Sequence, residues 1–476
     1  MFDGVARRQV SGLDLTAHSV AVLVPSLTAL GSGLAFPSMI GPGFWVSTLL
    51  GFAIVGLFVL VFNQFATRFR SAGGLYTFVA KGLGPLPALV VAGGLVIGYS
   101  GMIGFGLSDA AGRTDAALSS AGIGVLGGPG RELILLGIGA VMCLYAIGRG
   151  IHWSTRAALL AEIVSFVMLG VVLCTWTARY GFPSSAEFSL EGASVTRILM
   201  GAGFIVVLTL AFESSASLGL ESKRPFIEVP FALRSSLGLA AVLFGLANVV
   251  ASARPADAPS VWTWRWFAPG EDRSVIDALV LLVLAWSLVA LALCMWCALA
   301  RLLFSLAREG VLPAVLGRVN ARGNPMVAAL TVTPLAVLPS IAAVLVGDGA
   351  GAFSWDLKEA TGVVICTAYA LTAVSLVAFL KAIDEVSALP VIAAVVAGTA
   401  AAAVAVNELL TEMRQGAYLG LGMLVVAFVV GLMLKWHISR GAGRGDDGRY
   451  VGMHDEALAS TVRLPPDARG CEHAEV

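Results

Sequence analysis

The residues best suited to chemistry lie in one apolar stretch, FIVVLTLAFESSASLGLESKRPFIEVP, at positions 204–230. A carboxylate, Glu213, stands near its middle beside Ser214, Ser215 and Ser217. A charged group in hydrocarbon costs at least ~2.5 kcal/mol, so an acid placed there usually serves a function. Hydroxyl-bearing residues and glycine beside the acid weaken a helix. The pattern therefore predicts a helix that breaks inside a membrane, where Glu213 could carry a proton or coordinate a cation.

The composition of the whole chain is that of an integral membrane protein. Of its 476 residues, 58% are hydrophobic and 13% are charged, whereas soluble domains carry roughly 25% charged residues. The 30 basic and 30 acidic residues balance, so net charge does not point to a nucleic-acid partner. The six cysteines lack the spacing of a disulfide framework or a zinc site. We expect no metal centre and no cofactor.

Twelve apolar runs are long enough to form transmembrane helices. They predict an all-α fold with a short N-terminal segment at 1–13, ten helices within 14–380, two more within 388–436, and a polar tail at 437–476. The tail is rich in glycine and mixed charges and is expected to be disordered. The predicted spans are 14–39, 42–65, 86–108, 132–148, 155–178, 197–222, 234–253, 275–304, 326–346, 358–380, 388–407 and 416–436.

Basic residues predict the orientation of these spans. Twelve spans place both termini on one side of the membrane, and 21 of the 30 lysines and arginines fall on that side. Cytoplasmic loops carry an excess of lysine and arginine, so both termini are predicted to be cytoplasmic. We expect a multi-pass protein of the inner or plasma membrane of the cell.

The first span contains a second interruption. It reads LTAHSVAVLVPSLTALGSGLAFPSMIG, in which Pro25 removes a backbone donor and Gly31-Ser32-Gly33 weakens the helix further. Open backbone at this depth persists only where it is buried in protein or lines a cavity. A broken helix offers carbonyls to a cation and N–H groups to an anion. A simple proline kink is the alternative for this span.

The two interruptions are five spans apart. This is the spacing of a five-plus-five inverted repeat whose first helices are both discontinuous. The spacing predicts that helices one and six are broken at the same depth and form one site between them. The prediction rests on positions alone, because no repeat is visible in the residues themselves.

Three stretches of the chain resemble the amino acid–polyamine–organocation (APC) permease superfamily. One is similar to the loop after helix two of that family, one to its helix-six pattern, and one to its cytoplasmic motif after helix eight. The third is the most specific, and the resemblance covers about residues 10–440. The stretches are FATRFRSAGGLYTFVAKGLGP at 65–85, LAFESSASLGLESKRPFIEVP at 210–230 and ALARLLFSLAREGVLPAVLGRVNARGNP at 298–325.

The resemblance implies a bundle of helices 1, 2, 6 and 7 that rocks against a scaffold of helices 3, 4, 8 and 9, while helices 5 and 10 gate. It implies that a substrate carboxylate meets N–H groups at the helix-one break and that the amine meets carbonyls at the helix-six break. The helix-one break would fall at Pro25, Ser26, Leu27 and Thr28, or alternatively at Gly31, Ser32 and Gly33; the helix-six residues would be Thr209, Leu210, Ala211 and Phe212. Tyr99, Leu208 and Trp296 are nominated by position to select the substrate side chain, with ordinary apolar packing as the alternative.

The coupling ion is less defined. Some proton-coupled members of the family place a lysine on helix five that stands in for a sodium ion. Span five here has no lysine but has Glu162, close in depth to Glu213. Glu162 could relay protons or be a paired structural acid. Proton coupling is expected, and sodium coupling remains the alternative. At the end of span six, Glu221 with Lys223 and Arg224 could latch a cytoplasmic gate or form a solvated charge cluster.

The paired breaks and the resemblance predict a secondary active transporter for an amino acid or related amine, working by alternating access as a proton-coupled symporter or exchanger. A polyamine, organic-cation or sodium-coupled transporter of the same fold is the alternative. A channel or a membrane sensor is less favoured, because no filter-like carbonyl loop repeats and no soluble domain is large enough for signalling. The chain lacks HExxH, a P-loop and a supported GxSxG, so we do not expect an enzyme. The expected partners are a small-molecule substrate and the lipid bilayer; the oligomeric state stays open.

Overall fold

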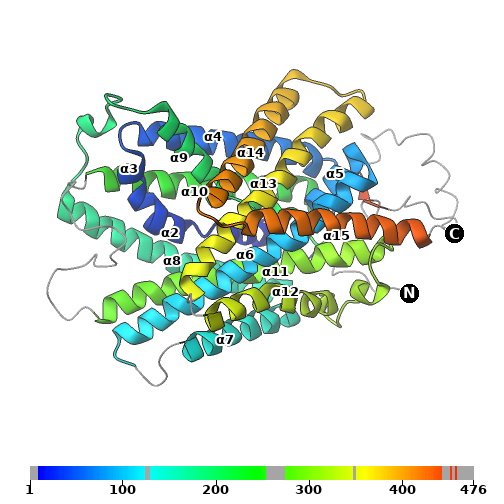
Figure 1. Ribbon diagram of the computed structural model, residues 1–476, viewed down its shortest axis with the longest axis horizontal. Helices are drawn as coiled ribbons and strands as arrows, with labels where there is room; N and C mark the ends of the chain where they lie inside the picture. The colour runs from blue at the N-terminus through cyan, green and yellow to red at the C-terminus, as the bar shows by residue number, and fades with distance from the viewer. Residues whose placement is uncertain are drawn as a thin grey trace.

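The computed structural model of the chain describes residues 9–123, 129–253, 274–346, 350–441, 451–452 and 456–457. Within these ranges the regular structure is helical apart from one pair of very short strands. β1 (Phe69–Arg70) pairs antiparallel with β2 (Glu456–Ala457), which places Arg70 opposite Glu456. Figure 1 shows long helices that cross one another throughout the body of the molecule. The all-α prediction is thereby confirmed.

The predicted twelve-helix membrane architecture is confirmed as well. Among the described residues, eleven helices are long and apolar enough to cross a membrane, and the predicted ninth span supplies a shorter apolar helix. The first and sixth spans are interrupted. The others are α4 (Phe44–Ala66), α6 (Pro85–Ser120), α7 (Pro129–Arg149), α8 (Ile151–Tyr180), α10 (Pro225–Ser252), α11 (Ser274–Arg308), α12 (Met326–Val346), α13 (Ala350–Ala382), α14 (Ala388–Arg414) and α15 (Leu419–Gly441).

The first span consists of four pieces. It runs through α1 (Gly12–Leu23), α2 (Pro25–Thr28), the π-helical η1 (Ala29–Gly33) and α3 (Leu34–Ile40). Between α1 and α2, Val24 adopts a left-handed conformation with φ 42° and ψ 55°, which a β-branched residue rarely takes. The span is therefore interrupted at Val24 and Pro25, and it is more than a proline kink.

The sixth span is interrupted in a similar way. α9 (Val195–Leu208) ends before Ala211, which is left-handed with φ 67°, and the chain continues as the 3-10 helix η3 (Phe212–Leu218). A 3-10 helix has poorer hydrogen-bond geometry than an α-helix and often marks a functional hinge. Both predicted discontinuous helices are present.

The long helix α6 lies in the middle of the assembly and packs closely on its neighbours (Figure 1). A Cβ at Gly106 would lie 2.9 Å from the Leu288 carbonyl oxygen of α11, and one at Gly93 would lie 2.4 Å from the Ala427 carbonyl oxygen of α15. Small residues let the backbones of membrane helices approach closely, and such contacts are common because lipid supplies no hydrophobic force that would drive helices together. Helix three therefore lies in the interior of the helix bundle.

Both ends of the described chain lie on one face. Val10 forms a parallel bridge with Ser222, which follows η3, and the Gly452 N–H lies 2.9 Å from Glu309 Oε2 at the end of α11. We call this the termini face. α15 continues to Gly441, into the segment predicted as a disordered tail. Residues 1–8, and 442–450, 453–455 and 458–476 of the tail, lie outside the described residues.

Candidate functional site

The first piece of helix one, α1, contacts helix six directly after its break. Ser19 Oγ of α1 lies 3.0 Å from the Phe212 carbonyl oxygen and 2.7 Å from Ser215 Oγ. His18 Nε2, one residue earlier, lies 3.2 Å from Ser214 Oγ. All five residues are buried. The hydroxyl groups of η3 that weaken helix six are thus the same groups that attach it to helix one.

Glu213 is the centre of a buried hydrogen-bond cluster. Its side chain is 1% exposed. Tyr99 of α6 donates to Glu213 Oε1 at 2.8 Å, and the Tyr369 hydroxyl of α13 donates to Oε2. The Ala211 N–H donates to the Tyr369 hydroxyl at 3.0 Å. The carboxylate therefore joins the break of helix six to helices three and ten through hydroxyl groups.

Tyr369 is held in place by aromatic rings. Its ring centroid lies 5.0 Å from those of Phe58 and Phe62 in α4, and Phe62 also packs against Phe212 at 5.9 Å. These separations are typical of favourable aromatic pairs. Helix two thus supports the side of the Glu213 cluster that faces helix ten.

The break of helix one presents polar groups that lack partners. Ser26 is fully buried, and its hydroxyl has no hydrogen-bond partner among the described residues. The N–H groups of Ser26 and Leu27 open α2, where a helix has no internal acceptor for them. The Thr28 hydroxyl instead bonds back to the Val24 carbonyl at 2.9 Å. The first turn of α2 is therefore suited to hold an anionic group.

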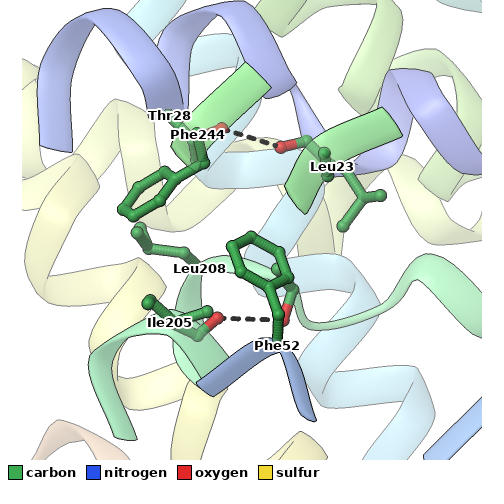
Figure 2. Close-up of a pocket in the computed structure, with 8 residues that line it drawn as sticks. Leu23, Thr28, Phe52, Ile205, Leu208 and Phe244 are labelled. Atoms are coloured by element: carbon green, nitrogen blue, oxygen red, sulfur yellow. Dashed lines mark hydrogen bonds between the residues drawn. The ribbon is translucent and has the colours of Figure 1, made fainter. Parts of the chain in front are cut away.

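A small pocket lies beside the two breaks (Figure 2). Its wall is apolar except for two threonines whose hydroxyls bond to carbonyls of their own helices, Thr28 to Leu23 and Thr209 to Ile205. All its residues belong to helices one, two, six and seven, so it lies within that group of helices. It is lined by Leu23, Thr28, Phe52, Ile205, Leu208, Thr209, Ala240 and Phe244.

The residues predicted to bind substrate lie in several different places in the structure. Thr28, Leu208 and Thr209 line the pocket, while Tyr99 and Ala211 join the Glu213 cluster. The binding roles of all these residues stay predictions. Of the others, Pro25, Leu27, Leu210 and Phe212 are buried at the breaks, and Gly31, Ser32 and Gly33 lie in or end the π-helix η1.

Trp296 lies in a different environment. It is fully buried in α11, and its indole N–H donates to the Ala329 carbonyl of α12 at 2.8 Å. This bond fixes the ring between helices eight and nine. Its selection role stays a prediction, with packing between these two helices as the visible contact.

Glu162 forms a separate buried acid site. It is 1% exposed in α8, and Ser287 of α11 donates to its Oε1. Its Oε2 and the Ser165 hydroxyl one turn on have no partner within the part of the chain that the structure describes. Helices five and eight are joined by this contact. A buried carboxylate oxygen without a donor is costly unless it holds a proton or a cation, so the coupling prediction for Glu162 remains open.

Two contacts of these elements were not predicted from the sequence. Tyr369 was not singled out, because one tyrosine in an apolar span has no distinguishing spacing. The partner of Glu221 was also missed. Arg301 of α11 binds both Glu221 oxygens, with Nε 2.6 Å from Oε1 and Nη2 2.9 Å from Oε2. Both residues are 1% exposed. Glu221 is therefore part of a buried ion pair and not of a solvated charge cluster.

The fold and these contacts define a class. A membrane bundle whose first and sixth helices break side by side, with a buried carboxylate at one break, has the architecture of an inverted-repeat secondary transporter. Residues 15–405 match the amino acid permease family. The chain belongs to this family, within the APC superfamily, and is a transporter rather than an enzyme.

Individual relatives are distant. The chain is 24% identical over 349 residues to the branched-chain amino acid permease of Lactococcus lactis, covering 68% of this chain and 74% of that protein. It is 24% identical to cationic amino acid transporter 4 of Mus musculus, covering 66% of this chain and only 52% of that protein. It is also 24% identical to the methylthioribose transporter of Bacillus subtilis, covering 66% of this chain and 70% of that protein.

Proposed function

We propose that this protein is a secondary active transporter that moves an amino acid or a related amine by alternating access, coupled to protons as a symporter or exchanger. We place it in the cell membrane with both termini cytoplasmic. The observation that carries the proposal is the Glu213 cluster at the break of helix six, which is tied by hydroxyl groups to helices three and ten.

Substrate binding would use the open backbone at both breaks. The substrate carboxylate would accept hydrogen bonds from the N–H groups of Ser26 and Leu27 and from the Ser26 hydroxyl. Two observations support this: the Ser26 hydroxyl is buried without a described partner, and helix N-termini favour negative charge. The amine would bind carbonyl oxygens between Thr209 and Phe212, where the chain leaves helical geometry.

Proton coupling would act through the hydrogen bonds of Glu213. An ionised carboxylate only accepts hydrogen bonds, whereas a protonated one also donates. When Glu213 takes up a proton, its new O–H needs an acceptor, and one of the two tyrosine hydroxyls would supply it by turning its own proton away from the carboxyl group. Tyr369 also accepts the Ala211 N–H, so its rearrangement would reach the backbone of the helix-six break. Loading of a proton is thereby connected to the shape of the binding site.

Glu162 would be a second proton site. Its free Oε2 and its contact with Ser287 link helices five and eight. Proton exchange there would change the interaction between these helices. A sodium ion held at the same carboxylate is the alternative coupling, and it would give uptake that depends on a sodium gradient and not on pH.

The test is uptake into proteoliposomes with an imposed pH gradient, after a substrate panel has been screened by thermal shift, since a ligand raises the apparent stability of the folded state. We expect Glu213→Gln to abolish gradient-driven accumulation and to spare exchange of substrate across the membrane. Glu412→Gln is the matched control, because Glu412 is a buried acid of α14 to which the proposal gives no role in coupling. Unaltered pH-driven uptake by Glu213→Gln would remove the proposed role of Glu213.

A further inference from the structure

A described piece of the C-terminal segment is seated on the termini face. Tyr76, fully buried in α5 (Leu75–Leu83), donates its hydroxyl to Glu309 Oε2, just beyond the end of α11. The Gly452 N–H joins this pair, at 2.9 Å from Glu309 Oε2 and 3.2 Å from the Tyr76 hydroxyl. A hydrogen bond to a carboxylate is stronger than one between neutral groups. Gly452 is thus bound where α5 meets α11.

The position of residue 452 is suited to glycine. Gly452 has φ +74°, and a Cβ built on it would lie 2.3 Å from the Ala80 Cβ of α5. A side chain there would meet both the left-handed backbone penalty and a rigid neighbour. The preceding residue, Val451, is 9% exposed and packs in the main apolar core. The surface therefore fits the glycine at position 452 and the apolar residue that precedes it.

A second described piece of the segment lies on the same face. β2 pairs with β1, and the register sets Glu456 opposite Arg70 and Ala457 opposite Phe69. Phe69 is itself covered by Lys81 of α5, whose Nζ lies 5.3 Å from the ring centroid. The segment thus contacts both β1 and the junction of α5 with α11.

These contacts tie together elements that would move apart. β1 follows α4, which is helix two, whereas Glu309 follows α11, which is helix eight. α5 is fastened to helix ten, since the Ser375 hydroxyl of α13 donates to the Phe78 carbonyl at 2.8 Å. We propose that the segment carrying Val451 and Gly452 is a strap that holds the termini face closed and slows its opening. This inference rests on the proposed alternating access, in which helices two and eight belong to different moving bodies.

The first test measures whether the strap is docked, and it is independent of transport. Hydrogen exchange by mass spectrometry on the full-length protein reads the amides around position 452. Gly452→Val should speed their exchange about tenfold, the factor that corresponds to loss of one charge-assisted hydrogen bond. The matched control is Gly416→Val, because Gly416 has φ +77° and nothing within 4 Å of its built Cβ. Unchanged exchange in Gly452→Val would overturn the docking.

The second test measures opening. In a background carrying Cys174→Ser and Cys471→Ser, the substitution Ser222→Cys places a thiol at a fully buried position on the termini face. Its labelling by a membrane-impermeant maleimide should be about tenfold faster with Gly452→Val, and initial uptake rates should rise in the same variant. Faster exchange around position 452 with unchanged labelling, or with slower uptake, would overturn the strap as a restraint on opening.

A pair of substitutions, in which the second compensates for the first, distinguishes loss of this contact from general destabilisation of the protein. Gly452→Ala should undock the strap through the Ala80 clash, and Ala80→Gly in the same chain should restore much of the exchange protection. No rescue would show that the clash does not control docking. If the parent protein transports no substrate, the proposed function fails while the exchange and labelling results still stand.

Discussion

At the scale of single residues, the buried ion pair between Arg301 and Glu221 joins helix eight to the end of helix six. The guanidinium binds the carboxylate through two parallel bonds, and its Nη1 donates to the Cys297 carbonyl at 2.9 Å. The Glu221 carbonyl in turn accepts the N–H groups of Gln9 and Val10, each at 2.9 Å. One acidic residue therefore fastens the N-terminal segment, helix six and helix eight to one another.

Removal of one partner of this pair should be more damaging than removal of both. Glu221→Gln leaves a buried arginine charge without its counter-ion, which typically costs about 3–5 kcal/mol. Glu221→Gln combined with Arg301→Met removes both charges and should recover most of that loss. Thermal unfolding of the purified protein measures the difference. If the double variant is no more stable than Glu221→Gln alone, the unpaired arginine charge is not the cause of the lost stability.

Sequence reading placed Glu213 inside the membrane, beside a helix break, but did not identify the groups that bind it. An acid in the middle of an apolar span is expected to face the protein interior or a water-filled cavity and not lipid, so this much could be predicted from the position of Glu213 in the span. The partners of Glu213 come from residues 114 and 156 positions away in the chain. Such contacts depend on the rotation of helices three and ten about their own axes. The apolar character of those spans does not predict this rotation.

At the scale of elements, the first helix shows how far a sequence pattern can place a break. The segment 25–28 and the segment 31–33 were alternatives, and both are irregular. The chain breaks between Val24 and Pro25, and the glycines fall in a π-helix. A Cβ at Gly33 would lie 3.1 Å from the Ala247 Cβ of α10. That close packing accompanies the π-helix, and it cannot be read from span one alone.

Helix ends were predicted less well than helix centres. Span three was expected to end at 108, whereas α6 continues to Ser120. Beyond the apolar run, the helix is extended by polar contacts, such as the Asp109–Arg113 pair at 2.9 Å with the i,i+4 spacing. A hydropathy pattern locates the part of a helix that lies in lipid and does not detect its polar continuation.

The break in helix one should be required for transport and dispensable for folding. Pro25→Ala restores a backbone donor and favours a continuous helix, which would close the N–H groups of Ser26 and Leu27. We expect uptake to fall at least tenfold while the unfolding temperature is unchanged or higher. Pro37→Ala is the matched control, because Pro37 lies inside α3 of the same span. Equal uptake by the two variants would contradict a role for the break.

At the scale of the whole molecule, the number and order of the spans followed from hydropathy, whereas their packing did not. The chain has 55 glycines, and only the structure shows which of them bring α6 against α11 and α15. Close approach depends on which face of each helix meets its neighbour. Orientation in the membrane, by contrast, depends on the number of lysines and arginines in the loops on each side. It can be predicted without knowledge of the packing.

The orientation gives the last prediction. Because 21 of 30 basic residues fall on the side of the termini, that side should be cytoplasmic. Arg224 is exposed on the termini face, and Ser185 is exposed in the loop between α8 and α9. In a background carrying Cys174→Ser and Cys471→Ser, Ser185→Cys should react with an impermeant maleimide in intact cells, whereas Arg224→Cys should react only after permeabilisation. Labelling of Arg224→Cys in intact cells, with protection of Ser185→Cys, would show the opposite orientation and would assign the Arg301–Glu221 pair to the outer side of the transporter.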